Sequence, residues 1–109
     1  MSKNEFIVLT TEDVPGSKIS KVLGLVKGST VRSRNFARDI GAGLKTLVGG
    51  EIKTYTAMAN DARDEALNRM INEAISKGAN AVIGMRFSTS MIMQGASEMV
   101  AFGTAVVLK

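Results

Sequence analysis

The sequence lacks cysteine and histidine entirely, and it has a single proline among 109 residues. Without cysteine there are no disulfides, no thiolate catalysis and no cysteine-based metal site, which fits a reducing compartment. Without histidine, the commonest general base and the commonest transition-metal ligand are both missing. We therefore expect no cofactor, no metal site and no enzyme in which histidine activates a serine.

Long hydrophobic runs are absent as well. The chain starts with polar residues, and the apolar run at residues 6–9 is too short for a secretory signal. No stretch approaches the roughly 18 apolar residues that a membrane-spanning helix needs. We expect a soluble, cytoplasmic protein that makes no membrane contact and forms a single domain over residues 1–109.

The charge is modest and uneven. The net charge is +4, and residues 1–50 carry all of the excess, with eight basic and four acidic side chains. The densest basic part comprises Arg32, Arg34 and Arg38, which we take as candidate ligand-binding residues for a small anion. Only Phe36 lies among them, so the interleaved aromatics that stack nucleic-acid bases are missing. No specific nucleic-acid binding is expected.

Residues 51–77 give the clearest prediction, a long helix. Small and apolar residues recur along one stripe, which includes Ala59, Ala62, Ala66, Met70 and Ala74. On the opposite face of the predicted helix, side chains of opposite charge lie four residues apart, such as Glu65 and Arg69, and these pairs stabilise a helix. Glycine 78 follows where a left-handed helix cap belongs. The alanines predict that another element approaches this helix closely.

A shorter helix is predicted within residues 35–47, where apolar residues also recur at helical spacing. Gly41 and Gly43 lie inside that pattern, although the spacing matches neither a dinucleotide fingerprint nor a phosphate-binding loop. Packing or capping explains these glycines better.

Four segments read as strands, at residues 6–10, 18–31, 81–89 and 98–108. Pro15 and Gly16 suit the centre of a type II turn before the second strand. Gly24 and Gly28 within that strand indicate a bulge or a close backbone approach. Residues 91–96 are expected to connect the last two strands. Strands around a helical middle predict an α+β domain, with helices packed on an antiparallel or mixed sheet.

The last strand, residues 98–108, has small or apolar side chains on both faces. A sheet with one solvated face should alternate apolar and polar residues. Helices of a two-layer domain cover one face, so the second face needs another cover. A second copy of the chain is the favoured cover. The alternative is a pair of helices from the same chain on opposite faces.

Methionine offers an alternative function, because the chain has seven of them. Thioether sulfur is a soft ligand suited to Cu(I), and Met85, Met91, Met93 and Met99 are near one another in sequence. Methionine also fills irregular cores and interfaces, which is its commoner use. No residue pattern assigns a catalytic role, so we expect no catalytic residues and no enzyme activity.

Several segments together closely resemble the YbjQ-like family of uncharacterised bacterial and archaeal proteins. They are residues 31–35, 38–45, 48–51, 78–82, 91–96 and 102–106. The resemblance implies a dodecin-like α+β subunit assembled with itself as a ring-shaped homopentamer. The family is often labelled heavy-metal-binding. The usual ligands for that role, cysteine and histidine, are absent here, so the resemblance transfers no metal ligand to this chain.

Overall fold

The computed structural model describes residues 6–33 and 50–109. The elements along the chain are β1 (Ile7–Val8), β2 (Ile19–Ser33), α2 (Gly50–Ser76), β3 (Ala81–Met93) and β4 (Ala96–Leu108). The strands form one mixed sheet in the order β1-β3-β4-β2, in which β1 runs parallel to β3. Both β2 and β3 run antiparallel to β4. The α+β prediction is therefore confirmed, while the shorter helix predicted within residues 35–47 lies outside the described residues.

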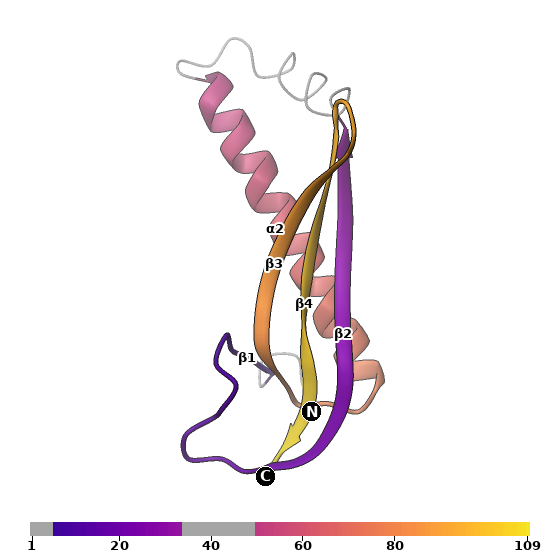
Figure 1. Cartoon of the computed structure of the whole chain (residues 1–109). Helices are drawn as coiled ribbons and strands as arrows, with labels where there is room; N and C mark the ends of the chain where they lie inside the picture. The colour runs from indigo at the N-terminus through magenta and orange to yellow at the C-terminus, as the bar shows by residue number, and fades with distance from the viewer. Residues whose placement is uncertain (1–5, 34–49) are drawn as a thin grey trace.

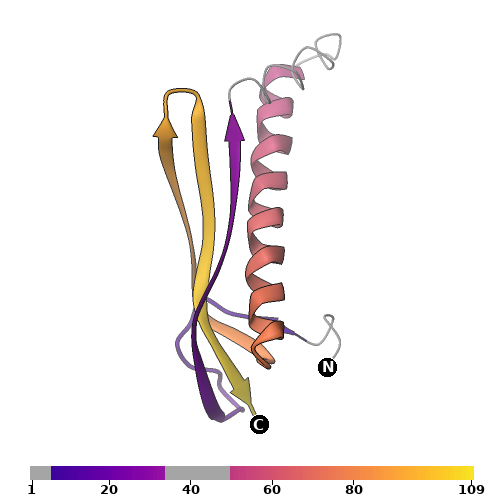
Figure 2. The ribbon, with the colours of Figure 1, turned by 90° about the vertical axis from the view of Figure 1, so that its right-hand side faces the viewer.

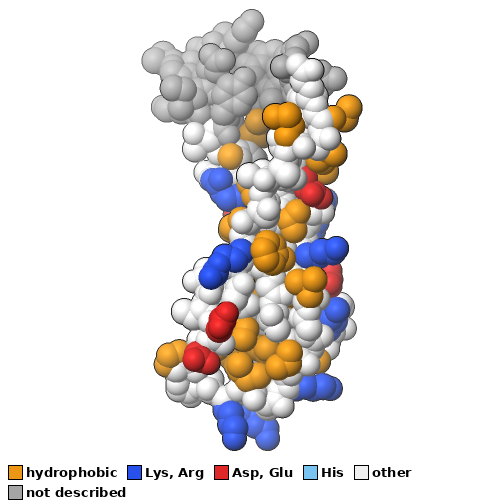
Figure 3. Space-filling model, in the orientation of Figure 1, with side chains coloured by type: hydrophobic (Ala, Val, Ile, Leu, Met, Phe, Trp, Pro, Cys, Tyr) orange, Lys and Arg blue, Asp and Glu red, His pale blue; other side chains and the backbone are white. Residues whose placement is uncertain are grey.

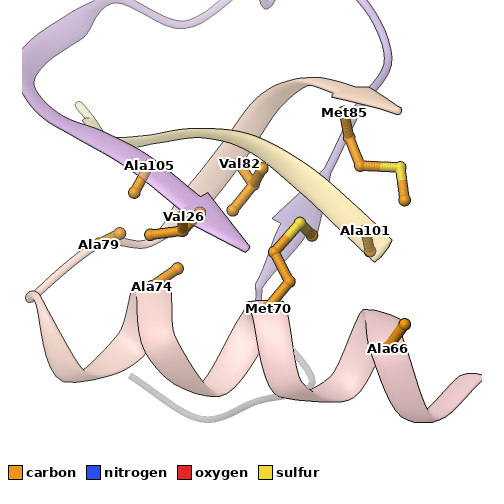
Figure 4. Packing of buried hydrophobic residues seen from close by; sticks show 9 residues of the cluster. All are labelled: Val26, Ala66, Met70, Ala74, Ala79, Val82, Met85, Ala101 and Ala105. Atoms are coloured by element: carbon orange, nitrogen blue, oxygen red, sulfur yellow. The ribbon is translucent and has the colours of Figure 1, made fainter. Parts of the chain in front are cut away.

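Helix α2 lies along one face of the sheet, over β2 and β4 (Figures 1 and 2). Its buried residues recur every fourth position, at Ala62, Ala66, Met70 and Ala74. Side chains from β2, β3 and β4 complete this core, as Figure 4 shows. Among the described residues, no helix combines the length and the hydropathy required to cross a membrane.

The C-terminal end of α2 is a Schellman motif around Gly78. The Ala79 amide donates to the Ala74 carbonyl at 3.0 Å, and the Gly78 amide donates to Ile75 at 2.9 Å. Gly78 has a φ of +90°, the left-handed conformation that glycine adopts most easily. The predicted cap is confirmed, and it turns the chain directly into β3.

Gly28 allows α2 to approach β2 closely. A Cβ atom built on Gly28 would lie 2.3 Å from both the Ala66 carbonyl oxygen and the Met70 amide nitrogen. The predicted close approach is thus confirmed. Gly24 marks the predicted bulge, because the β2–β4 register shifts there and its φ is +103°.

The β3–β4 hairpin is longer than the sequence predicts. β3 continues through the polar residues 88–90 to Met93, and β4 starts at Ala96. Residues 91–96 are therefore not an extended connection, since the turn itself is Gln94 and Gly95, with Gly95 at a φ of +83°. A two-residue turn with a glycine at positive φ lets both strands pair up to their ends.

The sheet face opposite α2, called the open face below, is covered at one end only by the described residues. Near the chain termini Ala81, Ile83 and Val106 are buried, and Val14 and Ile19 pack against them. Further along, Val100 and Phe102 of β4 are only half-buried. Their β2 neighbours Leu25 and Val31 are 63% and 52% exposed. The second apolar face of β4 is therefore not enclosed by the part of the chain that the structure describes.

The described chain is elongated, at 52 × 28 × 21 Å, with a radius of gyration of 16.8 Å. A compact domain of this length has a radius of gyration of about 13 Å. The difference follows from long strands that run the length of the molecule beside α2 (Figure 1). Such a shape leaves much of the sheet surface available for contact.

Candidate functional site

Arg32 lies near the end of β2, at a position whose side chain faces α2. Its guanidinium donates to Glu65 Oε2 at 2.6 Å and to Thr30 Oγ1 at 2.6 Å. Arg69, one helical turn after Glu65, forms an ion pair with the other carboxylate oxygen. Arg69 also donates to the backbone carbonyl of Ser29. These bonds tie α2 to β2, and we call Arg32, Glu65 and Arg69 the arginine–glutamate triad.

The electrostatics of the triad keep Glu65 ionised. The hydrogen bond from Arg32 lowers the pKa of Glu65 below its ordinary value of 4.5. Partial loss of hydration opposes this effect, and the positive charges of Arg69 and Arg32 add to the lowering. Two guanidinium groups and one carboxylate leave the triad with one positive charge.

The structure places only one of the three candidate arginines. Arg32 belongs to the triad, and Arg34 and Arg38 lie outside the described residues. Arg69 is the neighbouring cation that the sequence did not connect with Arg32. Its pairing with Glu65 could be predicted from helical spacing, but the bond between Arg32 and Glu65 joins residues 33 positions apart.

The four methionines proposed as soft-metal ligands do not form one site. Met85 is buried in the core at the start of β3. Met91 is six residues further along the same strand, about 20 Å away at the usual rise per residue, and it is 75% exposed. Met99 packs against the core instead. The strand geometry separates Met85 from Met91, so the described part of one chain does not bring all four sulfur atoms together.

Carboxylates offer no substitute ligands. Among the residues that the structure describes, no three histidine, cysteine, aspartate or glutamate side chains lie close enough together to hold a metal ion. Asp61 and Asp64 are exposed on the side of α2 that faces away from the sheet. Asp61 and Asp64 are therefore surface charges.

The open face contains a row of side chains that sequence reasoning missed. Phe102 of β4 pairs with Lys27 of β2 on one side and with Arg86 of β3 on the other. Basic side chains flank the apolar strip on this face in Figure 3. The strand register brings the two cations beside the same ring, and register is not readable from the separate segments.

Comparison with known proteins gives consistent relatives over nearly the whole chain. A UPF0145 protein of Methanoculleus marisnigri is 58% identical over 102 residues, covering 94% of this chain and 95% of that one. A UPF0145 protein of Clostridioides difficile is 56% identical, covering 94% and 92% of the two chains. One from Archaeoglobus fulgidus is 54% identical, covering 98% and 99%. The names of these relatives state no enzymatic activity.

A solved structure supports the fold. A protein of unknown function of the DUF74 family from Pediococcus pentosaceus matches with a TM-score of 0.59 and 14% sequence identity. The match covers 95% of this chain and 98% of that one. At this level of identity the likeness concerns the fold alone.

A family described as "Putative heavy-metal-binding" matches residues 6–109. The donor set of this chain does not fit that description, because the sequence has neither cysteine nor histidine and the described carboxylates do not cluster. The match nevertheless spans most of the sequence and agrees with relatives more than half identical. The chain belongs to the YbjQ-like family of UPF0145 proteins.

Proposed function

We propose that this chain works as a homo-oligomer in which each copy covers the open face of another. The observation that carries the proposal is the second face of β4, where Val100 and Phe102 are half-buried beside the exposed Leu25 and Val31. Apolar surface of this kind gains free energy when a partner removes it from water. The role is that of a non-enzymatic assembly.

Charge indicates which surface of the second copy fits. Lys27 and Arg86 stand on either side of Phe102 on the open face. The outward side of α2 exposes Asp61 and Asp64. Packing the open face of one copy against the outward side of α2 in the next brings opposite charges together.

This contact joins two different surfaces, so repeating it leads to a ring when the rotation closes. The family resemblance implies five copies in a dodecin-like arrangement, and we adopt the homopentamer as the proposed ring. The elongated subunit supports this assembly, because a long sheet presents a long contact surface.

Light scattering on the purified protein tests the proposal. We expect a mass near five times the 11.6 kDa chain, or a multiple of that mass where rings associate, at micromolar concentration. Leu25→Glu places a charge in the apolar part of the open face and should reduce the mass, whereas Ser17→Glu, in the exposed turn after Pro15, should not. A wild-type monomer would overturn the proposal.

A charge reversal tests the partner surface. Lys27→Glu combined with Arg86→Glu should weaken assembly, because it sets acidic groups against Asp61 and Asp64. Adding Asp61→Lys and Asp64→Lys to the same chain should restore the mass. If the four changes together assemble no better than the first two, α2 is not the surface that the open face contacts.

A small anion bound near the arginines is a second proposal. The triad retains one positive charge, and Arg69 is exposed beside it. Titration calorimetry with inorganic phosphate should detect binding that is lost when Arg32, Arg34 and Arg38 are all replaced by alanine. Lys27→Ala is the control. Phosphate binding that survives the triple replacement, or none in the wild-type protein, would refute this site.

A further inference from the structure

The two long edges of the sheet differ in how their backbone groups are used. The Val106 carbonyl of β4 accepts from Asn80 at 3.1 Å, so the backbone groups of even-numbered β4 residues point toward β3. Those of odd-numbered β4 residues then point toward β2, where they meet even-numbered partners such as Val26 and Gly28. After the Gly24 bulge, the odd-numbered residues of β2 from Leu25 to Val31 therefore direct their amide and carbonyl groups to the outer edge.

Basic side chains occupy this outer edge of β2. The carbonyl of Leu25 accepts from Lys77 Nζ at 3.5 Å, and the carbonyl of Val31 accepts from Arg32 at 3.3 Å. Between them, the Ser29 carbonyl accepts from Arg69. Charged side chains on an edge strand hinder pairing with another chain. The edge of β2 is closed in this way.

Among the described residues, only the first part of the β3 edge forms backbone hydrogen bonds with another segment. The Met85 amide donates to Leu9 at 3.0 Å, and the Gly84 amide donates to Thr11 at 2.8 Å. The Met85 bond shows that odd-numbered residues after the Gly84 bulge direct their backbone groups outward. Among the described residues, no hydrogen bond outside the β4 ladder reaches the stretch from Phe87 to Met93.

The side chains of residues 87–93 suit strand pairing. This stretch reads Phe-Ser-Thr-Ser-Met-Ile-Met, with no charge, no proline and no glycine. Phe87 is 42% exposed and Met91 is 75% exposed, because α2 lies over β2 and β4. An uncharged edge strand of this length with exposed apolar side chains is the kind that pairs with an identical segment.

We propose that two copies of this chain pair antiparallel through the β3 edge, about a two-fold axis at Thr89. In this register Thr89 lies opposite Thr89 of the second copy, and Phe87 lies opposite Met91. All of these residues direct their backbone groups outward, so each opposed pair exchanges two hydrogen bonds. The register also brings the Met91 sulfur beside the Phe87 ring, a favourable contact.

This contact is separate from the proposed ring. The ring contact involves the open face and α2, whereas the two-fold contact involves the strand edge. Both helices then lie on the same side of the joined sheet, with Phe87, Thr89 and Met91 of each copy between them. The edge contact joins two rings, or two isolated copies if the ring does not form.

Because the chain has no cysteine, a single introduced thiol reports the contact directly. Opposed residues of a hydrogen-bonded pair have Cα atoms about 5.5 Å apart, within the range of a disulfide. Thr89→Cys should give a covalent dimer on mild oxidation with diamide. Two control variants should cross-link at least about tenfold more slowly. In Ser88→Cys the two thiols do not lie opposite each other, and in Asn72→Cys the thiol is exposed on α2. Equal rates for the three variants would overturn the proposal.

The proposed edge contact and the proposed ring can be tested independently of each other. In a Leu25→Glu background, which should disrupt the ring, Thr89→Cys should still form the covalent dimer. Thr89→Lys and Thr89→Glu should each halve the mass measured by light scattering, because like charges meet at the two-fold axis. An equimolar mixture of the two should regain the wild-type mass. A wild-type mass that neither substitution changes would rule out the contact.

Discussion

Gly28 and Met70 meet backbone to backbone, since a Cβ atom on Gly28 would lie 2.3 Å from the Met70 amide nitrogen. The Ala66 carbonyl oxygen is equally near. No side chain can move aside to relieve this contact, because both neighbouring atoms belong to the helix backbone. Gly28 therefore fixes the distance between α2 and β2, and with it the position of the triad.

Gly28→Ala should destabilise the fold, because α2 must move away from the sheet to admit one methyl group. The expected loss is about 1–3 kcal/mol in the free energy of unfolding, the usual range for overpacking a core. Urea denaturation measures it. Ser29→Ala, on the next residue of the same strand, is the control and should change the free energy by less than about 0.5 kcal/mol.

Met70→Ala should lower the free energy of unfolding by about 2–5 kcal/mol. Met70 is fully buried, so the substitution leaves a cavity between α2 and the sheet. Met93→Ala removes the same atoms from a side chain that is 66% exposed and that the proposed two-fold contact does not use. Its effect on the free energy of unfolding should stay near zero. Similar losses at both positions would mean that Met70 is not enclosed as described.

The triad predicts that the stability of the fold depends on pH. The pKa of Glu65 is lowered in the fold, so its ionised form stabilises the folded state at pH values above its ordinary pKa of 4.5. That contribution is lost as the pH falls through the lower pKa of the folded state. Glu65→Gln should therefore destabilise the protein at pH 7, and the difference from wild type should shrink below pH 4.5.

Denaturant midpoints measured from pH 7 down to pH 3 check the triad prediction. Glu12→Gln, at an exposed carboxylate outside the triad, is the control and should show a smaller effect at pH 7. A Glu65→Gln effect that is constant over the whole range would show that ionisation of Glu65 does not stabilise the contact between α2 and β2.

Asn80 should stabilise the end of β4. Its side-chain amide donates to the Leu108 carbonyl at 2.9 Å, and its side-chain oxygen accepts from the Leu108 amide at 2.7 Å. Asn80→Ala removes both bonds, with an expected loss of about 1–3 kcal/mol. Faster hydrogen exchange of the Leu108 amide should accompany the loss. Asn72→Ala, which is exposed on α2, should leave that amide unchanged.

Local chemistry made much of the fold predictable from the sequence. The helix expected at residues 51–77 is α2 at Gly50–Ser76, because its stripe of small residues and the capping glycine act over a few positions. Gly24 and Gly28 have the predicted roles for the same reason. The extent of β3 was missed, because the polar residues 88–90 gave no apolar pattern to follow beyond residue 89.

The candidate site depends on relationships between distant residues, which explains why less of it could be predicted. The clustering of Arg32 with other arginines suggested an anion site, but the fold pairs Arg32 with Glu65 on α2. The row at Phe102 follows from the register of three strands. Only a packed structure shows which charge neutralises which, so a count of nearby charges overestimates the positive potential at Arg32.

The pairing of β2 has a consequence during protein synthesis. Among the strands that the structure describes, β2 forms its ladder only with β4, so that Gly28 pairs with the distant Ala101. A nascent chain therefore carries β2 and α2 without their sheet partner until β4 has emerged from the ribosome. Termination of synthesis before Ala96 yields a product that cannot build this core, because Ala101 and Ala105 of β4 belong to it.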